Sequence, residues 1–224
     1  MKVNEDLLME DELTLYGYWR SSASYRVRIA LNLKGLACEM KPVHMVRQGG
    51  EQHSAAFRAI NPQGLVPVLV HKGEVITQSL AICEYLDDCF EQYPLLPAQP
   101  LQRARIRSLA LQLACDIHPL NNLRVTKYLR DQYGDVVNAV EWMRHWMLEG
   151  FSAIELQLAD HPQLLEAGNP GLFECFLVPQ VYNAERFGTD LSAFPDIRRL
   201  VAMCRKLPAF IQAAPENQAD AEEV

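Results

Sequence analysis

Short segments with a strand-like hydrophobic pattern alternate with segments that have a helix-like pattern in the first part of the chain, up to about Gln92. Lys72-Gly73 lies between two short apolar runs and indicates a hairpin. The order of the predicted elements favours a small mixed sheet with helices on its faces. The predicted strands cover 13–18, 37–43, 67–71 and 75–77, and the predicted helices cover 22–34 (ended by Gly35), 54–59 and 79–91.

A different pattern follows the segment 93–100, which contains three prolines. No helix or central strand tolerates that spacing, so the segment is predicted to be a linker. Beyond it the spacing is helical throughout, at 101–133 with a kink at Pro119, 136–159, 172–187, 196–206 and 208–214. The expected parts are an acidic N-terminal segment 1–12, an α/β domain 13–92, the linker 93–100, an all-α domain 101–215 and an acidic tail 216–224.

The composition is that of a globular protein. Of 224 residues, 49% are hydrophobic and 22% charged, which excludes disorder, collagen and a small disulfide scaffold. The longest apolar stretch, near Leu65–Val70, is far short of a membrane span, and acids stand where a signal peptide needs bases. We therefore expect a protein that is neither exported nor bound to a membrane.

The charge limits the kinds of partner to be expected, and the cysteines indicate the compartment and the absence of a metal site. The net charge of −7 arises from the two terminal segments, and no basic run with interleaved aromatics exists, so nucleic acid is not an expected partner. A small anionic substrate remains compatible with the nearly neutral body of the chain. The six cysteines include no Cys-x-x-Cys pair and no metal-ligand spacing, which indicates a reducing cytoplasm and no metal.

Three places carry candidate chemistry. Ser21 and Ser22 stand where a strand passes into a helix, which would stabilise an anion, although a serine there is also a favoured helix cap. Pro67 opens a strand; a cis bond before it would turn the Val66 backbone outward. Gln78 and Ser79 precede a third helical run and could hold a carboxylate.

These segments together resemble the zeta class of glutathione transferases, which includes maleylacetoacetate isomerase. The resemblance runs from Leu13 to Pro208, and its motifs are residues 21–31, 61–69, 78–82, 119–123 and 177–187. It implies a thioredoxin-like N-terminal domain, an all-helical C-terminal domain, a homodimer and glutathione as cofactor.

The resemblance also implies roles for individual residues. Ser21 and Ser22 are the expected catalytic residues: Ser21 donates a hydrogen bond to the glutathione sulfur, and Ser22 lies beside it at the start of the helix. Arg186, and as a second candidate Arg20, would bind a substrate carboxylate. The other residues implied to bind glutathione are Gln52 at its glycyl end, Val66–Pro67 at its cysteinyl unit, Gln78 and Ser79 at its γ-glutamyl group, and Asn121.

The chain departs from the family pattern at three positions. Asn121 replaces a glutamine found in some relatives, and its shorter side chain weakens the case for a contact. Ala23 follows the two serines where a cysteine is common. Gly171 and Glu174 begin a helix that usually starts with Thr/Ser-x-x-Asp, so the acid is kept and the hydroxyl lost; we expect a small effect on stability and the same fold.

The activity implied is glutathione-dependent cis–trans isomerisation of maleylacetoacetate to fumarylacetoacetate in tyrosine and phenylalanine breakdown, by reversible thiolate addition. One alternative is a zeta-class transferase acting on α-halo acids, and another is a non-catalytic binding protein with the transferase fold. Retention of Ser21, Val66–Pro67 and Gln78-Ser79 argues against the last. His118, in an apolar helical pattern, is expected to be structural.

Overall fold

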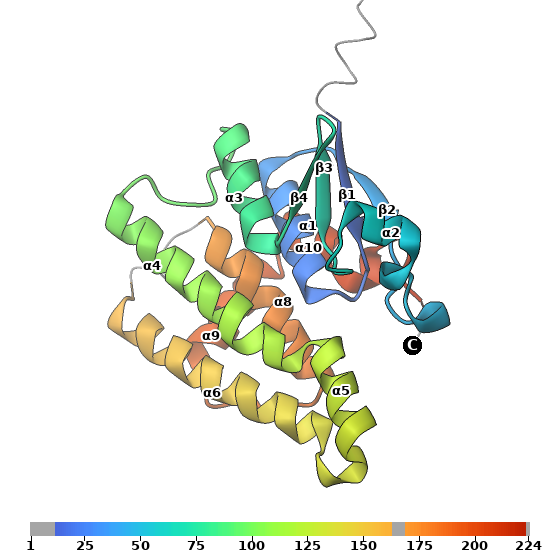
Figure 1. Ribbon diagram of the computed structural model, residues 1–224. Coiled ribbons are helices and arrows are strands. Elements are labelled where there is room, and N and C mark those ends of the chain that lie inside the picture. The colour runs from blue at the N-terminus through green and yellow to red at the C-terminus, as the bar shows by residue number, and fades with distance from the viewer. Residues whose placement is uncertain (1–11, 163–168, 223–224) are drawn as a thin grey trace, which may run out of the picture. The chain divides into compact units, whose positions relative to one another are not determined.

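The computed structural model describes residues 12–162 and 169–222. These form two compact units (Figure 1). The first combines the described residues up to Leu95 with those from Pro208 onward, and the second comprises Leu96–Leu207. Of the predicted acidic N-terminal segment, all but its last residue lies outside the described residues.

The first unit contains the small mixed sheet that the sequence predicts. Its strands are β1 (Leu13–Gly17), β2 (Glu39–Pro42), β3 (Val68–His71) and β4 (Glu74–Thr77), in the order β2-β1-β3-β4. β1 pairs in parallel with β2, whereas β3 is antiparallel to both of its neighbours. Lys72 and Gly73 both have positive φ, as a tight hairpin turn between β3 and β4 requires.

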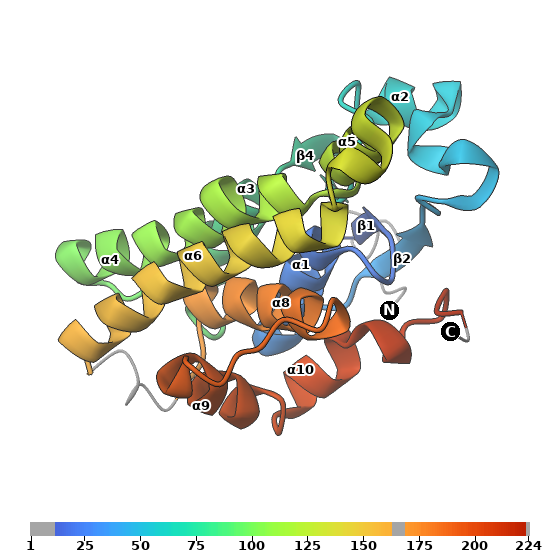
Figure 2. The ribbon, with the colours of Figure 1, turned by 90° about the horizontal axis from the view of Figure 1, so that it is seen from below.

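The helices of this unit are α1 (Ser22–Lys34), α2 (Ala55–Ile60), α3 (Ser79–Cys89) and α10 (Pro208–Ala213). α1 ends at Gly35, whose φ of 66° provides the left-handed stop predicted from the sequence. α1 packs against both α3 and α10 (Figures 1 and 2). The buried Lys34 ammonium lies 3.0 Å from Asp87 Oδ1 and joins the end of α1 to α3.

The C-terminal region differs from the prediction. The sequence assigned 208–215 to the helical domain and treated 216–224 as a solvated tail, but the structure groups this region with the sheet. α10 buries Phe210 against the first unit, and α1 side chains donate to its carbonyls, from Asn32 to Ala209 (2.9 Å) and from Arg28 to Ala213 (3.0 Å). These partners lie far away in the sequence, so the apolar pattern of 208–214 could not reveal which domain it joins.

The second unit is helical, as expected. It contains α4 (Pro100–Leu111), α5 (Leu123–Tyr133), α6 (Ala139–Asp160), α8 (Leu172–Arg186) and α9 (Pro195–Cys204). Almost every residue of α8 is buried, and α8 packs against α4 and α9, which makes it the central helix of this unit. No helix within the described ranges has the length and apolarity needed to cross a membrane.

The predicted helix 101–133 is wrong in its continuity. After α4 the chain makes a π-helical turn (Gln112–Ile117) and a 3-10 turn (His118–Asn121) before α5 begins. Pro119 has no N–H to donate to the preceding turn, and the Asn122 side chain accepts a hydrogen bond from the Arg124 N–H, which starts a new helix. Pro119 therefore separates two helices.

Candidate active site

A tight turn joins β1 to α1 and carries Ser21. The Ser21 N–H donates to the Tyr18 carbonyl (3.0 Å), and Ser21 then occupies the N-cap position with φ −70° and ψ 117°. Its Oγ accepts a hydrogen bond from the Ser24 N–H at 3.2 Å. Because the hydroxyl accepts in this bond, its own hydrogen remains available to donate to a further atom.

The structure decides which of the two serines caps α1. Ser21 is at the N-cap position and Ser22 is the first helical residue, 9% exposed, in agreement with the predicted helix 22–34. The turn closed by the Tyr18 carbonyl ends at Ser21, so the helix begins with the next residue. Ser21 therefore combines two roles, stabilising α1 and presenting a hydroxyl at the positive end of the helix.

A buried arginine that the sequence analysis did not single out holds this turn. The Arg28 side chain is 4% exposed and donates to the Trp19 carbonyl at 2.9 Å and to the Tyr18 carbonyl at 3.4 Å. A charged side chain in the middle of an apolar helix was the only sequence signal. Next to it in the turn, the half-exposed Arg20 lies with its guanidinium carbon 4.2 Å from the centre of the Trp19 ring.

Gln52 lies in a loop that is closed by a pair of hydrogen bonds. The His44 N–H donates to Glu51 Oε2 (2.7 Å), and the Glu51 N–H donates to the His44 carbonyl (2.8 Å). Gln52 follows directly, is 4% exposed, and donates from Nε2 to the Met45 carbonyl (3.3 Å). Its buried Oε1 has no hydrogen-bond partner in the described part of the chain, so this acceptor is available to an N–H donor from a ligand.

The Val66–Pro67 bond is cis, the geometry that the sequence analysis considered for exposing the Val66 backbone. Val66 precedes β3, whose ladders begin at Val68, so its peptide groups lie outside the regular pairing of the sheet. Its side chain belongs to an apolar cluster that also includes Tyr18 and Trp19, from the turn before Ser21. The buried members are Tyr18, Trp19, Val43, Phe57, Val66 and Val68.

Gln78 and Ser79 occupy the start of α3. Gln78 is its N-cap residue, with φ of 72°, and donates from Nε2 to Gln63 Oε1 at 3.1 Å. Ser79 Oγ accepts a hydrogen bond from Arg26 Nη1 at 3.1 Å, and both side chains are buried. Arg26 therefore adds a positive charge to the N-terminus of α3, where a carboxylate is already favoured.

The two remaining candidates lie in the helical unit. Asn121 is 7% exposed; its Nδ2 donates to the Ile117 carbonyl (3.0 Å) and its Oδ1 accepts from Asn183 (3.3 Å). Both ends of this amide are thus engaged within the unit. Arg186 is the last residue of α8, is exposed, and places its guanidinium carbon 4.6 Å from the centre of the Phe187 ring.

Three of the six cysteine thiols have a raised pKa. Burial raises the pKa of Cys38, Cys83 and Cys204 to about 12, so these thiols stay protonated at neutral pH. Burial also raises the pKa of Tyr18, against a smaller opposing effect of Arg20. Within residues 12–162 and 169–222, no three His, Cys, Asp or Glu side chains form a cluster that would hold a metal ion.

Comparison with known proteins identifies the family. Residues 15–94 match the glutathione S-transferase N-terminal domain. A probable maleylacetoacetate isomerase of Vibrio cholerae is 49% identical over 211 residues, covering 93% of this chain and 98% of that protein. A bacterial maleylpyruvate isomerase, described as a zeta-class glutathione transferase in its holo form, is 43% identical with a TM-score of 0.88, covering 93% and 100% of the two chains. The chain belongs to the zeta class of glutathione transferases.

A further relative is relevant to the ligand. The maleylacetoacetate isomerase of Anaeromyxobacter dehalogenans, solved with glutathione bound in its active site, is 39% identical with a TM-score of 0.82, covering 94% of this chain and 98% of that one. The thioredoxin-like sheet and the helical second unit expected for a zeta-class transferase are therefore confirmed.

The start of α8 keeps one of the two hydrogen bonds of a capping box, the one made by the acid. Glu174 Oε2 accepts a hydrogen bond from the Gly171 N–H at 2.8 Å, which is the role of the acid in a capping box. Burial raises the pKa of Glu174, and this hydrogen bond lowers it. The acid therefore still fixes the helix start without the hydroxyl, in agreement with the expectation of an unchanged fold.

Proposed function

We propose that this protein is a glutathione-dependent isomerase that converts maleylacetoacetate to fumarylacetoacetate, and thus acts in tyrosine and phenylalanine breakdown. The observation that carries the proposal is the Ser21 hydroxyl, which sits at the N-terminus of α1 with its hydrogen available to donate. The 49% identity to a probable maleylacetoacetate isomerase supports this reaction among those of the class.

The residues of the first unit suit glutathione along its whole length. Ser21 lies at the sulfur, and the Val66 backbone, preceding cis Pro67, pairs with the cysteinyl unit. The γ-glutamyl carboxylate binds at the start of α3, where Ser79 and Arg26 already form a hydrogen bond. At the other end, Gln52 Oε1, which has no partner among the described residues, accepts from the glycyl N–H.

Bound glutathione supplies a thiolate that adds reversibly to the cis double bond of the substrate, so that this bond can rotate as a single bond. The protein's part is to keep the sulfur ionised. A charged hydrogen bond from Ser21 contributes about 1.5 kcal/mol, and the N-terminus of α1 about 0.5–1 kcal/mol. A free thiol with a pKa of about 8.5 is mostly protonated at pH 7, and this stabilisation makes thiolate the major form.

Two arginines are proposed to bind the carboxylates of the substrate. Arg20 is oriented by the ring of Trp19, and Arg186 lies exposed at the end of α8. A guanidinium binds a carboxylate through two parallel hydrogen bonds, which orients a dicarboxylate as well as attracting it. Asn121 is the weakest of the proposed ligand contacts because its amide already bonds Ile117 and Asn183, which leaves one N–H and one lone pair for a ligand.

The function is tested by a glutathione-dependent isomerisation assay. Maleylacetoacetate, maleylpyruvate, dichloroacetate and a chloropropionate are compared as substrates of the purified protein. Fastest turnover of maleylacetoacetate supports the proposal, and fastest turnover of maleylpyruvate or of a halo acid replaces it with that activity. Binding of glutathione without turnover of any of the four would favour the non-catalytic alternative.

We further propose that the protein is a homodimer, as the zeta-class resemblance implies. Light scattering at micromolar concentration is expected to show a species of about twice the chain mass of 25.4 kDa. A single species near the mass of one chain would contradict this proposal.

We also propose that the protein acts in the cytoplasm. All six cysteines are free, and a reducing compartment keeps thiols in that state. Cell fractionation followed by detection of the protein tests this location.

Gly50 is predicted to control the position of Gln52. A Cβ at Gly50 would lie 2.4 Å from Gln52 Nε2, so Gly50→Ala must displace the amide. We expect the KM for glutathione to rise about threefold to tenfold, as for the loss of one neutral hydrogen bond.

Gly49→Ala is the matched control for this variant. Both glycines have positive φ (83° at Gly49, 102° at Gly50), but a Cβ at Gly49 meets nothing within 4 Å. Both variants therefore place a side chain at positive φ, and they differ in the contact with Gln52. An equal rise of KM in both would show that Gln52 is not involved.

A further inference from the structure

The segment 218–222, called here the C-terminal tether, lies against the two parts of the first unit that carry Ser21 and Gln52. It follows α10 and a short 3-10 turn (Pro215–Asn217). Its Ala221 packs on the apolar cluster that contains Tyr18, Trp19 and Val66. The sequence alone marked this stretch as a solvated acidic tail, whereas its described acids make specific contacts.

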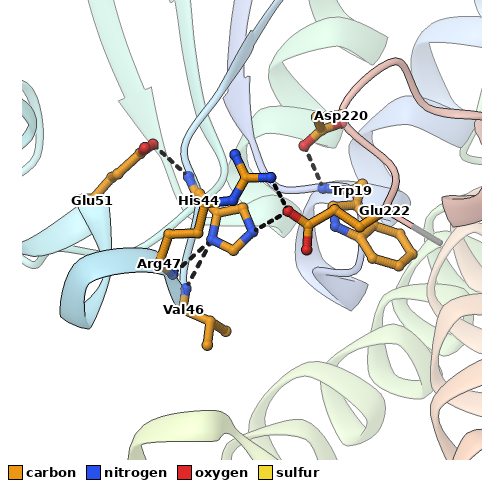
Figure 3. A network of polar contacts seen from close by, with 7 residues as sticks. All are labelled: Trp19, His44, Val46, Arg47, Glu51, Asp220 and Glu222. Carbon is orange, nitrogen blue, oxygen red and sulfur yellow. Dashed lines mark hydrogen bonds and ion pairs between the residues drawn. The ribbon is translucent and has the colours of Figure 1, made fainter. Parts of the chain in front are cut away.

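Asp220 contacts the turn that carries Ser21 (Figure 3). Its Oδ2 accepts a hydrogen bond from the Trp19 N–H at 3.1 Å. Arg28 donates to the carbonyl of Trp19 at 2.9 Å. The N–H and the carbonyl of Trp19, two residues before Ser21, are thus held from two sides by charged groups, and Trp19 in turn supports Arg20. Charged hydrogen bonds of this kind restrict a turn more strongly than neutral ones.

Glu222 contacts the loop that leads to Gln52. Its Oε1 lies 3.2 Å from His44 Nε2 and also pairs with Arg47 (Figure 3). His44 Nδ1 accepts from the Val46 N–H (3.2 Å) and the Arg47 N–H (2.8 Å), which places the ring hydrogen on Nε2, the nitrogen nearer to Glu222. The His44 N–H binds Glu51, the residue before Gln52.

We propose that the C-terminal tether positions the thiol-activating turn through Asp220 and the glycyl-end loop through Glu222. This inference rests on the proposed function, because it assumes that Ser21 and Gln52 bind glutathione. Asp220 and Glu222 are positioning residues: each acts through a neighbour, Trp19 in one case and His44 in the other. The two acids should therefore affect different kinetic constants.

The first test concerns Asp220. Asp220→Ala is expected to lower kcat about fivefold to tenfold, with the KM for glutathione changed less than about twofold. The ultraviolet absorbance of the bound thiolate should titrate at a higher pH than in the wild-type protein. Asp220→Asn retains a side-chain oxygen that can accept from the Trp19 N–H, and it should recover most of kcat. Wild-type kinetics in Asp220→Ala, or equal losses in the Ala and Asn variants, would overturn the role of Asp220.

The second test concerns Glu222. Glu222→Ala is expected to raise the KM and the calorimetric dissociation constant for glutathione about threefold to fivefold, with kcat nearly unchanged. A chain that ends at Gln218 should show both the kcat and the KM effects. Unchanged glutathione affinity in Glu222→Ala and in the shortened chain would overturn this part of the proposal.

Glu149→Ala serves as the control, because it removes an exposed acid of α6 in the other unit. It should leave kcat and KM unchanged, and thermal melts of all variants show whether folding is retained. Calorimetry and the thiolate titration do not depend on isomerase activity. If the wild-type protein binds glutathione but does not isomerise the substrate, the proposed function fails; if it isomerises and the tether variants match it, the tether alone fails.

Discussion

Replacing Ser21 with Ala is expected to lower kcat/KM for the isomerisation by about 10–100-fold at neutral pH, as for the loss of a charged hydrogen bond. Glutathione affinity should change little, because Val66, Gln78 and Ser79 hold the peptide. The loss should shrink as the pH rises, since the thiol then ionises without help from the hydroxyl. Steady-state kinetics over a range of pH, with calorimetry of glutathione binding, measures these effects.

The structure requires a control that the sequence alone did not suggest. Because Ser21 caps α1, its replacement by Ala also costs about 0.5–2 kcal/mol of stability. Ser54 caps α2 in the same way, with Oγ accepting from the Phe57 N–H at 3.2 Å, so Ser54→Ala loses a cap without touching the thiol site. Ser21→Thr keeps both the cap and the hydroxyl and should retain much of the activity.

Three outcomes distinguish the roles of the two serines. Ser22→Ala should be the milder change, because the hydroxyl that caps α1 belongs to Ser21. Full activity in Ser21→Ala would remove the thiol role from this residue. A larger loss in Ser22→Ala than in Ser21→Ala would transfer that role to Ser22.

The sheet and most helices could be predicted because their signals are local. Alternation marks β1, and the helix α1 begins and ends where the sequence predicts, with Gly35 as its stop. The hairpin between β3 and β4 follows from the residue pair Lys72-Gly73, which the turn needs at positive φ. In each case the residues that decide the structure lie within or beside the element.

The misassigned parts depend on distant partners. Assignment of α10 to the first unit rests on donors from α1, such as Asn32, which is far away in the sequence. The contacts of Asp220 with Trp19 and of Glu222 with His44 are equally non-local. An acidic stretch at the end of a chain has the same pattern whether it is solvated or bound, so no periodicity could separate the two.

In the candidate site, too, residues with a local sequence signal could be predicted and residues with distant partners could not. The residues proposed to bind glutathione could be singled out through short motifs, since Ser21, Val66–Pro67 and Gln78-Ser79 each occupy the end of an element. The residues that support them were not: Arg26 and Arg28 sit in α1 among apolar neighbours, and their partners lie in α3, in the Ser21 turn and in α10. The cost of burying each guanidinium is offset by contacts of this kind, which a sequence does not display.

Arg186→Ala is expected to reduce kcat/KM for a dicarboxylate substrate by about tenfold or more, while turnover of an uncharged electrophile changes little. The physical reason is the loss of a two-pronged guanidinium–carboxylate interaction that only the acidic substrate makes. Arg186→Lys should restore part of the activity, because an ammonium cannot reproduce the planar fork. Steady-state kinetics on one acidic and one neutral substrate gives the selectivity directly.

The competing explanation is that Arg186 holds the end of α8 in place. The obvious anchor, Glu185, is already bound by Arg205 through two hydrogen bonds of 2.9 and 2.6 Å. Arg205→Ala is therefore the matched control: it removes a nearby arginine whose contacts are structural, and it should lower the melting temperature without changing the ratio of the two activities. Proportional loss of both activities in Arg186→Ala, together with a lower melting temperature, would make Arg186 a structural residue and leave Arg20 as the proposed carboxylate ligand.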